Sequence, residues 1–200
     1  MQLTIATRNP HKMREIQEIL GTDFEVRDLR SYPEISDIDE TGTSFDDNAK
    51  LKVLAVSKIL PGFVAADDSG LEVDALKGAP GIYSARYAGP NATQNEKIDK
   101  LLRDLAQAGF RSDLRRGRFR CVVALARNSR LVGTFEGVVE GTIAHEPRGN
   151  RGFGYDPIFI PEGFEATFAE LPAEVKNTIS HRANAIRRLA VTLRQLGFRG

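Results

Sequence analysis

Residues 63–70 read Phe63-Val64-Ala65-Ala66-Asp67-Asp68-Ser69-Gly70, so that a short apolar run passes directly into two aspartates. An apolar run that follows Pro61-Gly62 in this way is typical of a strand buried on both faces. We expect the strand to end at Ala66, where the chain leaves the pleat and Asp67 and Asp68 both reach one crevice. An ordinary Asp-Ser-Gly turn is the alternative.

The segments on either side alternate between strand and helix patterns. Upstream, we expect strands at 3–6 and 24–29, helices at 10–20 and 45–60, and an acidic loop at 30–42. Downstream, we expect a short strand at 71–76, a loop rich in Gly and Pro at 77–90, and a helix that ends at Gly109. Two strands follow at 119–126 and 131–139, joined by a turn at Asn128-Ser129. The chain ends with a strand at 155–160 and a last helix that Ser180 caps. Strict β-α alternation is absent from this pattern. It therefore predicts an α/β fold with a mixed β-sheet flanked by helices, in a single domain spanning 1–200.

The composition is that of an ordinary globular protein, with 41% hydrophobic and 28% charged residues. The 28 basic and 27 acidic residues give a net charge of +1, which argues against a protein that coats nucleic acid but permits a small anionic ligand. One feature favours nucleic acid, a basic cluster that comprises Arg111, Arg115, Arg116, Arg118 and Arg120. The usual meaning of such a cluster is a solvated loop or a strand edge.

Cysteine use and hydropathy favour the cytoplasm. The lone Cys121 excludes an intramolecular disulfide, so a reducing compartment is expected. The N-terminus lacks the pattern of a secretory signal, and no run approaches the roughly 18 apolar residues that a membrane span needs. We therefore expect a cytoplasmic protein without a membrane partner.

The loop between the first strand and the first helix, Thr7-Arg8-Asn9-Pro10-His11-Lys12, has the composition of an anion site. Unpaired N–H groups and the positive end of the helix dipole attract anions there. The hydroxyl of Thr7, the amide of Asn9 and the ammonium of Lys12 add donors for phosphate oxygens. The pattern is not a Walker A loop, and a plain helix cap followed by a solvated lysine explains the same residues.

Two acidic segments can meet at one divalent cation. Carboxylate oxygens such as those of Asp67 and Asp68 suit Mg²⁺. The two neighbours also raise the pKa of each other, which lets one of them take a proton from water. The segment Asp39-Glu40-Thr41-Gly42 can supply Glu40 as another carboxylate, although by itself it reads as a solvated loop.

A glycine-flanked aromatic segment, Gly152-Phe153-Gly154-Tyr155-Asp156-Pro157, can present a ring face to a nucleobase. Stacking of this kind contributes about 1–3 kcal/mol, while a turn with a core phenylalanine is the alternative. Lys176 and the pair His181-Arg182 form a further candidate, because cations at a helix start oppose the helix dipole. A capped helix with two solvated cations explains the pair equally well.

Taken in order, these segments resemble those of the inosine/xanthosine triphosphate pyrophosphatase family, which hydrolyses deaminated purine nucleotides. The resemblance covers nearly the whole chain. It rests on Ala6-Thr7, Asn9, Lys12, Glu40-Thr41-Gly42, Asn48-Ala49, Lys52, Ala66–Leu71, Gly78–Arg86, Gly152–Phe159 and Ser180-His181-Arg182. The full series in this order is far more specific than any one of its motifs.

The resemblance implies a long, curved mixed sheet with helices, two lobes with an active-site cleft between them, and a homodimer. It implies Mg²⁺ as the cofactor, one ion per subunit, and a nucleoside triphosphate such as ITP, dITP or XTP as the substrate. Hydrolysis would give the nucleoside monophosphate and pyrophosphate, without a nucleic acid partner. A pyrophosphatase for other modified nucleotides is an alternative, and an RNA-binding module that uses the Arg111–Arg120 cluster is another.

The resemblance also implies roles for individual residues. Asp68 would be the catalytic base and a magnesium ligand, Glu40 the other acidic ligand, and Asp67 a possible second carboxylate beside them. The triphosphate would be held by Thr7, Arg8, Asn9, Pro10, His11, Lys12, Lys52 and Ser69. The base would be held by Phe153, Gly154, Tyr155, Asp156, Lys176, His181 and Arg182. Arg8 departs from the family, where many members have Gly, and we expect it to change the loop electrostatics rather than abolish activity.

Overall fold

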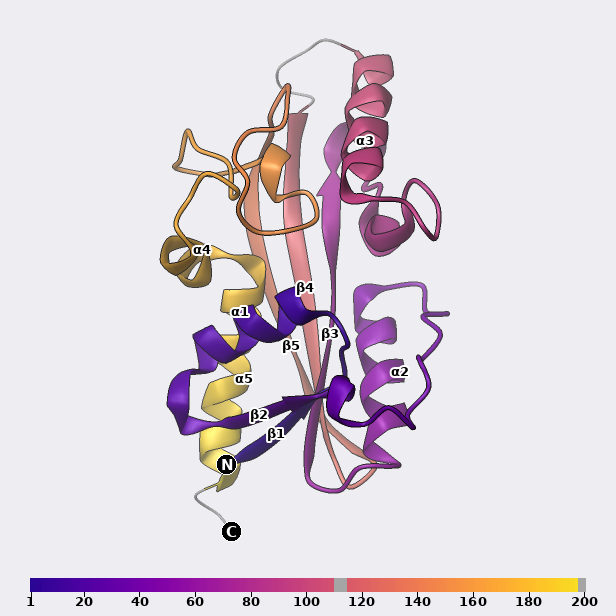
Figure 1. Cartoon of the computed structure of the whole chain (residues 1–200), viewed down its shortest axis with the longest axis vertical. Helices are drawn as coiled ribbons and strands as arrows, with labels where there is room; N and C mark the ends of the chain where they lie inside the picture. The colour runs from indigo at the N-terminus through magenta and orange to yellow at the C-terminus, as the bar shows by residue number, and fades with distance from the viewer. Residues whose placement is uncertain (110–114, 198–200) are drawn as a thin grey trace. The chain divides into compact units, whose positions relative to one another are not determined.

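The computed structural model describes residues 1–109 and 115–197 (Figure 1). Its six-stranded sheet has the order β2-β1-β3-β4-β5-β6. The chain divides into two compact units, a first unit of Met1–Asp68, Cys121–Gly137 and His181–Gly200, and a second unit of Ser69–Arg120 and Val138–Ser180. Three long strands contribute residues to both units, namely β3 (Phe63–Val73), β4 (Arg116–Arg127) and β5 (Arg130–Ile143).

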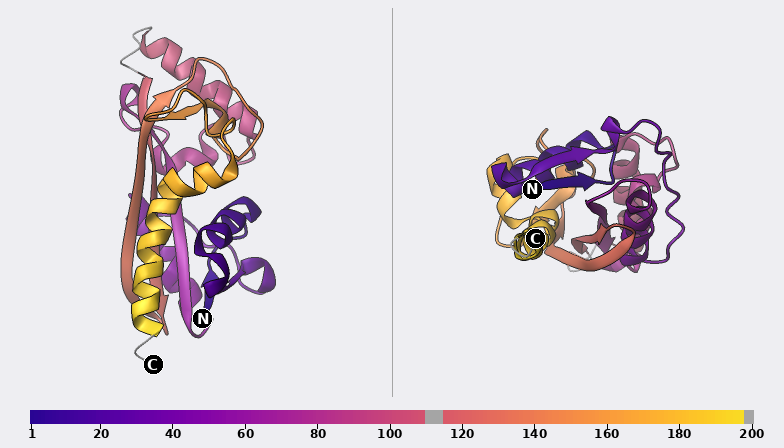
Figure 2. Two further views of the ribbon diagram at one scale, coloured as in Figure 1. Left: turned by 90° about the vertical axis from the view of Figure 1, so that its left-hand side faces the viewer. Right: turned by 90° about the horizontal axis from the view of Figure 1, so that it is seen from below.

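In the first unit, β1 (Gln2–Ile5) pairs in parallel with β2 (Glu25–Asp28) and with β3. The helices α1 (Pro10–Leu20) and α5 (His181–Gly197) lie side by side (Figures 1 and 2). Their apolar stripes pack into one core with the strands, because Ile and Leu recur on both helices at helical spacing. This core includes Leu3, Ile5, Ile16, Leu20, Ala65, Cys121, Ile186 and Leu189.

Cys121 belongs to this core and is completely buried. Burial, together with the negative charge of Asp67, raises the pKa of its thiol to about 12. The thiol therefore stays protonated at neutral pH and packs as a small apolar side chain.

A close backbone approach fixes the start of α5. A Cβ at Gly137 of β5 would lie 2.0 Å from the carbonyl oxygen of His181 and 2.5 Å from the nitrogen of Ala185. No side chain fits that space, so glycine is required for α5 to begin against β5. This contact sets where His181 and Arg182 enter the first unit.

In the second unit, β6 (Phe159–Pro161) pairs antiparallel with β5, and the helices are α3 (Gln94–Ala108) and α4 (Ala173–Ile179). A capping box of Thr93 and Glu96 starts α3. The core of this unit contains the aromatic rings of Phe119, Phe159 and Phe168 together with Leu71, Val73, Ile98, Leu101, Leu105 and Ile158.

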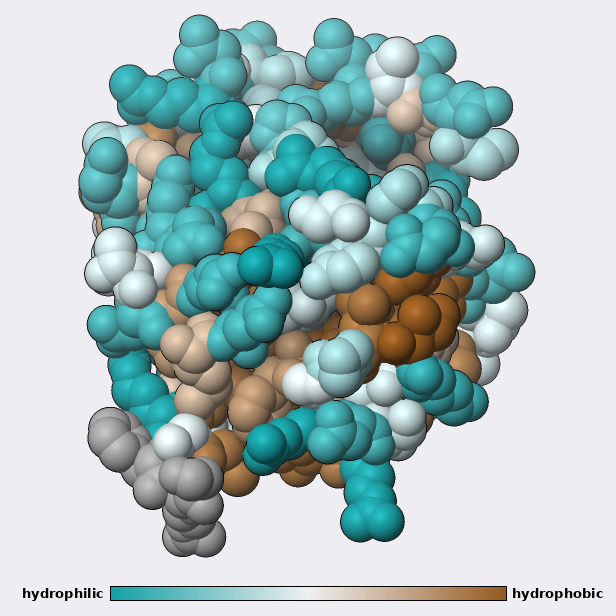
Figure 3. Space-filling view, turned by 60° about the horizontal axis from the view of Figure 1, so that its bottom comes forward, coloured by the Kyte–Doolittle hydropathy of each residue, from teal (hydrophilic) through white to brown (hydrophobic). Residues whose placement is uncertain are grey.

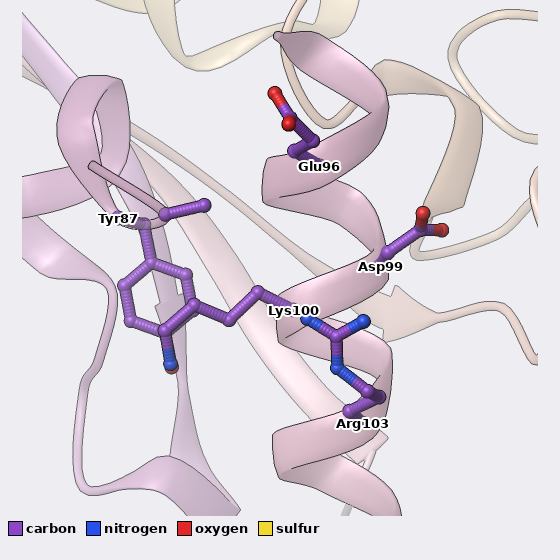
Figure 4. A pocket seen from close by; sticks show the side chains of 6 residues that line it. Tyr87, Glu96, Asp99, Lys100 and Arg103 are labelled. Carbon is purple, nitrogen blue, oxygen red and sulfur yellow. The ribbon is translucent and has the colours of Figure 1, made fainter. Parts of the chain in front are cut away.

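A hollow of about 310 Å³ lies beside α3 in the second unit (Figure 4). Lys100 Nζ lies 4.3 Å from the centroid of the Tyr87 ring and 2.6 Å from Asp104 Oδ2. The Tyr87 hydroxyl donates to the same carboxylate at 2.5 Å. Because Glu96 and Asp99 line the hollow beside cations, its charges are mixed and select neither anions nor cations.

The predicted α/β class with a mixed sheet is confirmed by the parallel and antiparallel pairings. The turn predicted at Asn128-Ser129 is confirmed too, since both residues have positive φ angles of 49° and 65° between β4 and β5. The helix predicted at 45–60 is α2 (Phe45–Ser57), with Ser44 as its N-cap.

Two local predictions are wrong, and one short helix has no counterpart among the predicted elements. The strand at residue 63 does not end at Ala66, because β3 continues to Val73 with further buried apolar residues. The strand predicted from residue 155 begins only at Phe159, after a 3₁₀ turn at Asp156–Ile158, because Pro157 has no N–H to donate to a sheet. The helix α4 lies where no helix was predicted, because its seven residues are too few to show a periodic stripe.

The arginine cluster forms contacts within the second unit. Arg118 pairs with Asp74 at 2.9 Å and with Glu140 at 2.9 Å, and Arg120 lies 3.6 Å from Glu72. The guanidinium of Arg115 donates to the carbonyl oxygens of Ile143 and Ala144, while Arg111 lies outside the described residues. Arg118 and Arg120 lie on β4, an interior strand between β3 and β5, rather than at a strand edge, and their ion pairs give no support to RNA binding.

The surface also carries apolar side chains (Figure 3). Among the described residues of the first unit, six large apolar side chains are between 40% and 59% exposed, namely Met1, Leu51, Ile59, Leu131, Val132 and Val191. Within residues 1–109 and 115–197, no helix combines the length and the hydropathy that crossing a bilayer requires.

Candidate active site

Two acidic residues predicted from the sequence meet at a lysine in the first unit. The ammonium nitrogen of Lys52 lies 2.6 Å from Glu40 Oε1 and 3.2 Å from Asp68 Oδ1. Lys52 stands on α2, Asp68 on β3, and Glu40 in the irregular segment before α2. One cation therefore holds together carboxylates from separate parts of the chain.

Asn48 connects the same two segments. Its Nδ2 donates to Asp68 Oδ2 at 3.1 Å, and its Oδ1 accepts from the backbone nitrogen of Gly42 at 2.8 Å. Asn48 and Lys52 are four residues apart on α2, so both project from one face of the helix. A Cβ at Gly42 would lie 2.6 Å from Asp47 Cβ, which explains why the chain approaches α2 with a glycine.

The pKa of Asp68 lies above its ordinary value of 3.8. Burial raises it most, the charge of Lys52 lowers it, and the charge of Glu40 raises it again. Burial lowers the pKa of Lys52, but the surrounding carboxylates outweigh burial and raise it, so the lysine stays charged. Asp68 is consequently a better proton acceptor than an exposed aspartate.

Asp67 turns to different partners in the first unit. Its Oδ2 lies 3.0 Å from Lys12 Nζ and 3.2 Å from Arg182 Nη2. Burial raises the pKa of Asp67, but the charges of Lys12 and Arg182 outweigh burial and hold it well below the ordinary value. Asp67 is therefore a permanently charged anchor for two cations.

The expectation that Asp67 and Asp68 leave the strand is wrong, whereas a crevice shared by the two carboxylates stays a prediction. Both lie inside β3, where consecutive side chains point to opposite faces. The strand accommodates two buried carboxylates in succession because each has a cationic partner, Lys12 and Arg182 for Asp67 and Lys52 for Asp68.

The loop before α1 is arranged as a helix cap. Asn9 Oδ1 accepts from the backbone nitrogens of His11 at 2.9 Å and Lys12 at 3.4 Å, while the nitrogen of Asn9 donates to Thr7 Oγ1 at 3.2 Å. Pro10 occupies the first turn, and His11 is exposed. The cap directs Lys12 toward Asp67, next to Asp68 in sequence, and phosphate binding by this loop stays a prediction.

Arg8 in the same loop turns toward the segment that precedes Glu40. Its Nη1 donates to the carbonyl oxygen of Leu29 at 2.7 Å, and its Nε lies 3.0 Å from Asp37 Oδ1. The side chain of Arg8 therefore contacts protein groups before Glu40 rather than the first turn of α1.

In the second unit, the glycine-flanked segment is organised around one carboxylate. Asp156 Oδ2 accepts from the backbone nitrogen of Phe153 at 2.7 Å and lies 2.5 Å from Lys176 Nζ. Gly152 has a positive φ of 70°, and a Cβ there would lie 2.0 Å from Asp156 Oδ2. A side chain at residue 152 would thus displace the carboxylate that orders the segment.

The ammonium of Lys176 lies 5.0 Å from the ring centroid of Phe153, which is half-buried. Attraction between the ammonium and the ring face holds the ring in place. Gly154 donates its backbone N–H to Gln94 Oε1 at 2.9 Å. The hydroxyl of Tyr155 donates to the carbonyl oxygen of Ser84 at 3.0 Å, so this tyrosine belongs to the core.

The predicted residues thus fall into two groups, one in each unit. The first unit brings together Lys12, Glu40, Lys52, Asp67, Asp68 and Arg182. The second unit brings together Phe153, Asp156 and Lys176. His181 is a buried residue at the start of α5 in the first unit, and Ser69 is half-buried on β3 in the second.

Two residues of the first-unit cluster were assigned no role from the sequence. Asn48 was part of the family pattern, and its spacing of four residues from Lys52 is the signal that places it beside Asp68. Glu15 accepts from Arg182 Nη1 at 2.5 Å. Its spacing of three residues from Lys12 on α1 places both on one face, but nothing in the sequence indicates its distant partner.

Glu40 and Asp68 form a donor set that suits a cation. Glu40 and Asp68 supply hard oxygen donors, and their shared contact with the ammonium of Lys52 demonstrates that they can surround one positive charge. Among the residues placed in the structure, no three His, Cys, Asp or Glu side chains gather as a metal cage. The set therefore fits an ion that takes one or two carboxylates and completes its shell with other oxygens.

Fold and site together define an α/β protein with a carboxylate–lysine centre on a mixed sheet. The model of the Ham1 family matches residues 3–192, and the chain therefore belongs to the Ham1 family. It is 47% identical over 98% of its length to a dITP/XTP pyrophosphatase from Listeria monocytogenes serotype 4b (strain F2365), of which the match covers 96%.

Two solved structures are similar over nearly the whole chain. A HAM1 protein from Coxiella burnetii matches with a TM-score of 0.87 and 40% identity, over 98% of this chain and 99% of the other. The Ham1 protein of Staphylococcus aureus matches with a TM-score of 0.85 and 42% identity, over the same shares.

Proposed function

We propose that this chain hydrolyses deaminated purine nucleoside triphosphates, such as ITP, dITP and XTP, to the nucleoside monophosphate and pyrophosphate. The observation that carries the proposal is the contact of Glu40 and Asp68 with Lys52, which gathers acidic ligands and a phosphate-binding cation. Membership of the Ham1 family, with a relative named dITP/XTP pyrophosphatase, supports the same reaction.

Glu40 and Asp68 are the residues that would hold Mg²⁺, one ion per subunit. Bound there, the ion supplies charge neutralisation and alignment for the phosphate oxygens. Phosphoryl transfer depends mostly on positioning and on neutralising charge, and Lys12 and Lys52 provide both for the triphosphate. The remaining phosphate contacts in this proposal come from the loop before α1, with Thr7 and Asn9, and from Ser69.

Asp68 acts as the general base. Its raised pKa suits it to accept the proton of the water that breaks the bond between the α and β phosphates. Asn48 holds one carboxylate oxygen, which leaves the other oriented toward Lys52. Asp67 keeps Lys12 beside this carboxylate without taking part in proton transfer.

Base selection follows from hydrogen-bond polarity. Inosine and xanthosine carry a C6 carbonyl, which accepts, where adenine carries an amino group, which donates. We propose that Phe153 stacks on the base and that donors from Lys176 and the backbone of the same segment face the carbonyl. A buried donor left facing an amino group costs about 1–3 kcal/mol, and more if it is charged, so a few such contacts exclude ATP.

We also propose that the protein is a cytoplasmic homodimer. Exposed apolar side chains on the first unit supply the kind of surface that a second copy covers. Size-exclusion chromatography with light scattering tests the assembly, with a mass twice that of one chain as the expected result.

A panel of nucleoside triphosphates, assayed for released phosphate with and without added inorganic pyrophosphatase, tests the proposed reaction. We expect phosphate only when the coupling enzyme is present, with ITP, dITP and XTP turned over far faster than ATP. Phosphate release without the coupling enzyme would identify a phosphatase instead. A preference for modified pyrimidines would identify a different pyrophosphatase, and retention of RNA without turnover would identify a binding module.

A further inference from the structure

We propose that Arg8 is a positioning residue that holds Glu40 ready for the divalent cation by fastening residues 29–37 to the loop before α1. The proposal deepens the proposed function and rests on it, because the location of Glu40 matters to catalysis only if the cation is needed there. Arg8 acts through Glu40 and does not itself contact the cation.

The guanidinium of Arg8 collects acceptors from one short segment. Nη1 donates to the carbonyl oxygen of Leu29 at 2.7 Å, and Nη2 donates to the carbonyl oxygen of Ile35 and, at 3.5 Å, to that of Tyr32. Nε lies 3.0 Å from Asp37 Oδ1. Arg8 therefore connects the chain before α1 with the chain between β2 and α2.

The three carbonyl acceptors lie on successive turns. The nitrogen of Tyr32 donates to the carbonyl oxygen of Leu29, and the nitrogen of Ile35 donates to that of Tyr32. Residues 29, 32 and 35 thus repeat with the three-residue period of a tight helix. Each carbonyl retains a second lone pair, and one planar guanidinium with fixed donors can bind several of them together.

The fastened segment leads directly to Glu40. Arg8 holds the chain at Asp37, and Asn48 holds it at Gly42 through the backbone nitrogen. The residues between these two points include Glu40, so the acidic ligand is fixed from both ends. Loss of Arg8 frees the end of this segment at Asp37. Ordering that end then costs conformational entropy when Glu40 binds the cation, so the cation binds more weakly.

The substitutions Arg8→Ala and Arg8→Lys test the proposal. Alanine removes every contact, whereas lysine keeps the charge but lacks the planar fork, so its effect should be intermediate. Arg14→Ala is the matched control, because Arg14 is an exposed arginine on α1, close to Arg8 in the sequence.

Three measurements are compared across these variants. The first is hydrogen exchange of the backbone amides of residues 29–42 in the metal-free protein. The second is the binding of Mn²⁺ in the absence of nucleotide, measured from the electron paramagnetic resonance signal of the unbound ion. The third is the Mg²⁺ concentration that gives half-maximal hydrolysis of ITP.

For Arg8→Ala we expect exchange about tenfold faster and confined to residues 29–42, because freeing even one residue of backbone has an effect of this order. We expect the Mn²⁺ dissociation constant and the Mg²⁺ requirement to rise by a similar factor, with kcat at saturating Mg²⁺ within about twofold of the wild type. Arg14→Ala should match the wild type in all three.

Unchanged exchange in both Arg8 variants would overturn the proposal. Faster exchange with unchanged Mn²⁺ affinity would overturn it as well, because Arg8 would then order the segment without serving the cation. A lower kcat with an unchanged Mg²⁺ requirement would assign Arg8 to the substrate instead. If the wild type does not hydrolyse ITP, the proposed function fails, while exchange and Mn²⁺ binding still decide the role of Arg8.

Discussion

The pKa of Asp68 is raised and that of Asp67 is lowered, although the two carboxylates are buried next to each other in one strand. Their partners explain the difference, because Asp67 faces two cations, whereas Asp68 shares the ammonium of Lys52 with a second carboxylate. Burial alone would raise both pKa values. At the residue scale, this difference suits Asp68 to the proposed role of base and Asp67 to that of an electrostatic anchor.

Replacing Asp68 with Asn should lower kcat for ITP hydrolysis by about 10²- to 10⁴-fold, because the neutral amide cannot accept a proton from water. Asparagine keeps the shape of the side chain and can still accept from Asn48, so folding should be retained. Pyrophosphate release measures the rate, thermal unfolding checks the fold, and Asp39→Asn, at an exposed aspartate, serves as the control. A rate close to the wild type would remove Asp68 from the role of base.

Replacing Asp67 with Asn should lower the free energy of unfolding by about 3–5 kcal/mol at pH 7, because Arg182 and Lys12 lose a buried anionic partner. Folding lowers the pKa of Asp67 below 3.8, so the unfolded chain takes up the proton more readily. The contribution of the charge is then complete above the unfolded value and is lost as pH falls through the lower folded pKa.

Urea unfolding of wild type and Asp67→Asn, from about pH 7 down to about pH 3, measures this dependence. We expect the difference in unfolding free energy to stay constant down to about pH 4 and to shrink below it. A difference that is already small at pH 7 would contradict the anchoring role.

At the element scale, the segment 152–156 depends on a glycine that lies against a carboxylate. Gly152→Ala should destabilise the protein by about 1–3 kcal/mol through its positive φ and should also displace Asp156 from Phe153 and Lys176. Because the base contacts are then disordered, KM for ITP should rise more than kcat falls.

Gly163→Ala is the matched control for this element, since Gly163 also has a positive φ of 84° but its Cβ would meet nothing within 4 Å. It should lose a comparable amount of stability while KM stays unchanged. Steady-state kinetics and thermal melts separate the two effects, and equal KM values in both variants would contradict the role of the Gly152 contact.

The sequence predicts elements well where one local signal dominates. The Asn128-Ser129 turn is local and appears as expected, and of the two local cap candidates, Thr43 and Ser44, the structure uses Ser44. The continuation of β3 through Asp67 and Asp68 was missed because it depends on cations from α1, α2 and α5, which local patterns do not place. The site residues came from motif order, whereas the pairing of Glu15 with Arg182 joins positions that only the fold brings together.

At the scale of the whole molecule, acidic and basic residues are nearly balanced in number. Arg118 and Arg120 form ion pairs with neighbouring carboxylates. No three-ligand metal cage forms within the described residues. The two apolar cores and the buried ion pairs stabilise the fold, and we predict that the divalent cation serves the proposed reaction rather than the fold.

Removal of divalent cations with EDTA should abolish ITP hydrolysis and leave the melting temperature within about 2 °C of the untreated protein. A structural metal would instead contribute to the folding free energy, and its removal would lower the melting temperature strongly. Calorimetry with and without EDTA, followed by Mg²⁺ addition to restore activity, makes the comparison. A large fall in melting temperature would contradict this view of the molecule.

The burial of Cys121 bears on the conditions under which the protein works. Nitrosating agents that convert purine amino groups to carbonyls, and oxidants that accompany them in a stressed cell, also attack accessible thiolates. The chain has one sulfhydryl, and the interior keeps it protonated and out of reach. Burial therefore protects the one thiol of the chain from the reagents that generate the proposed substrates.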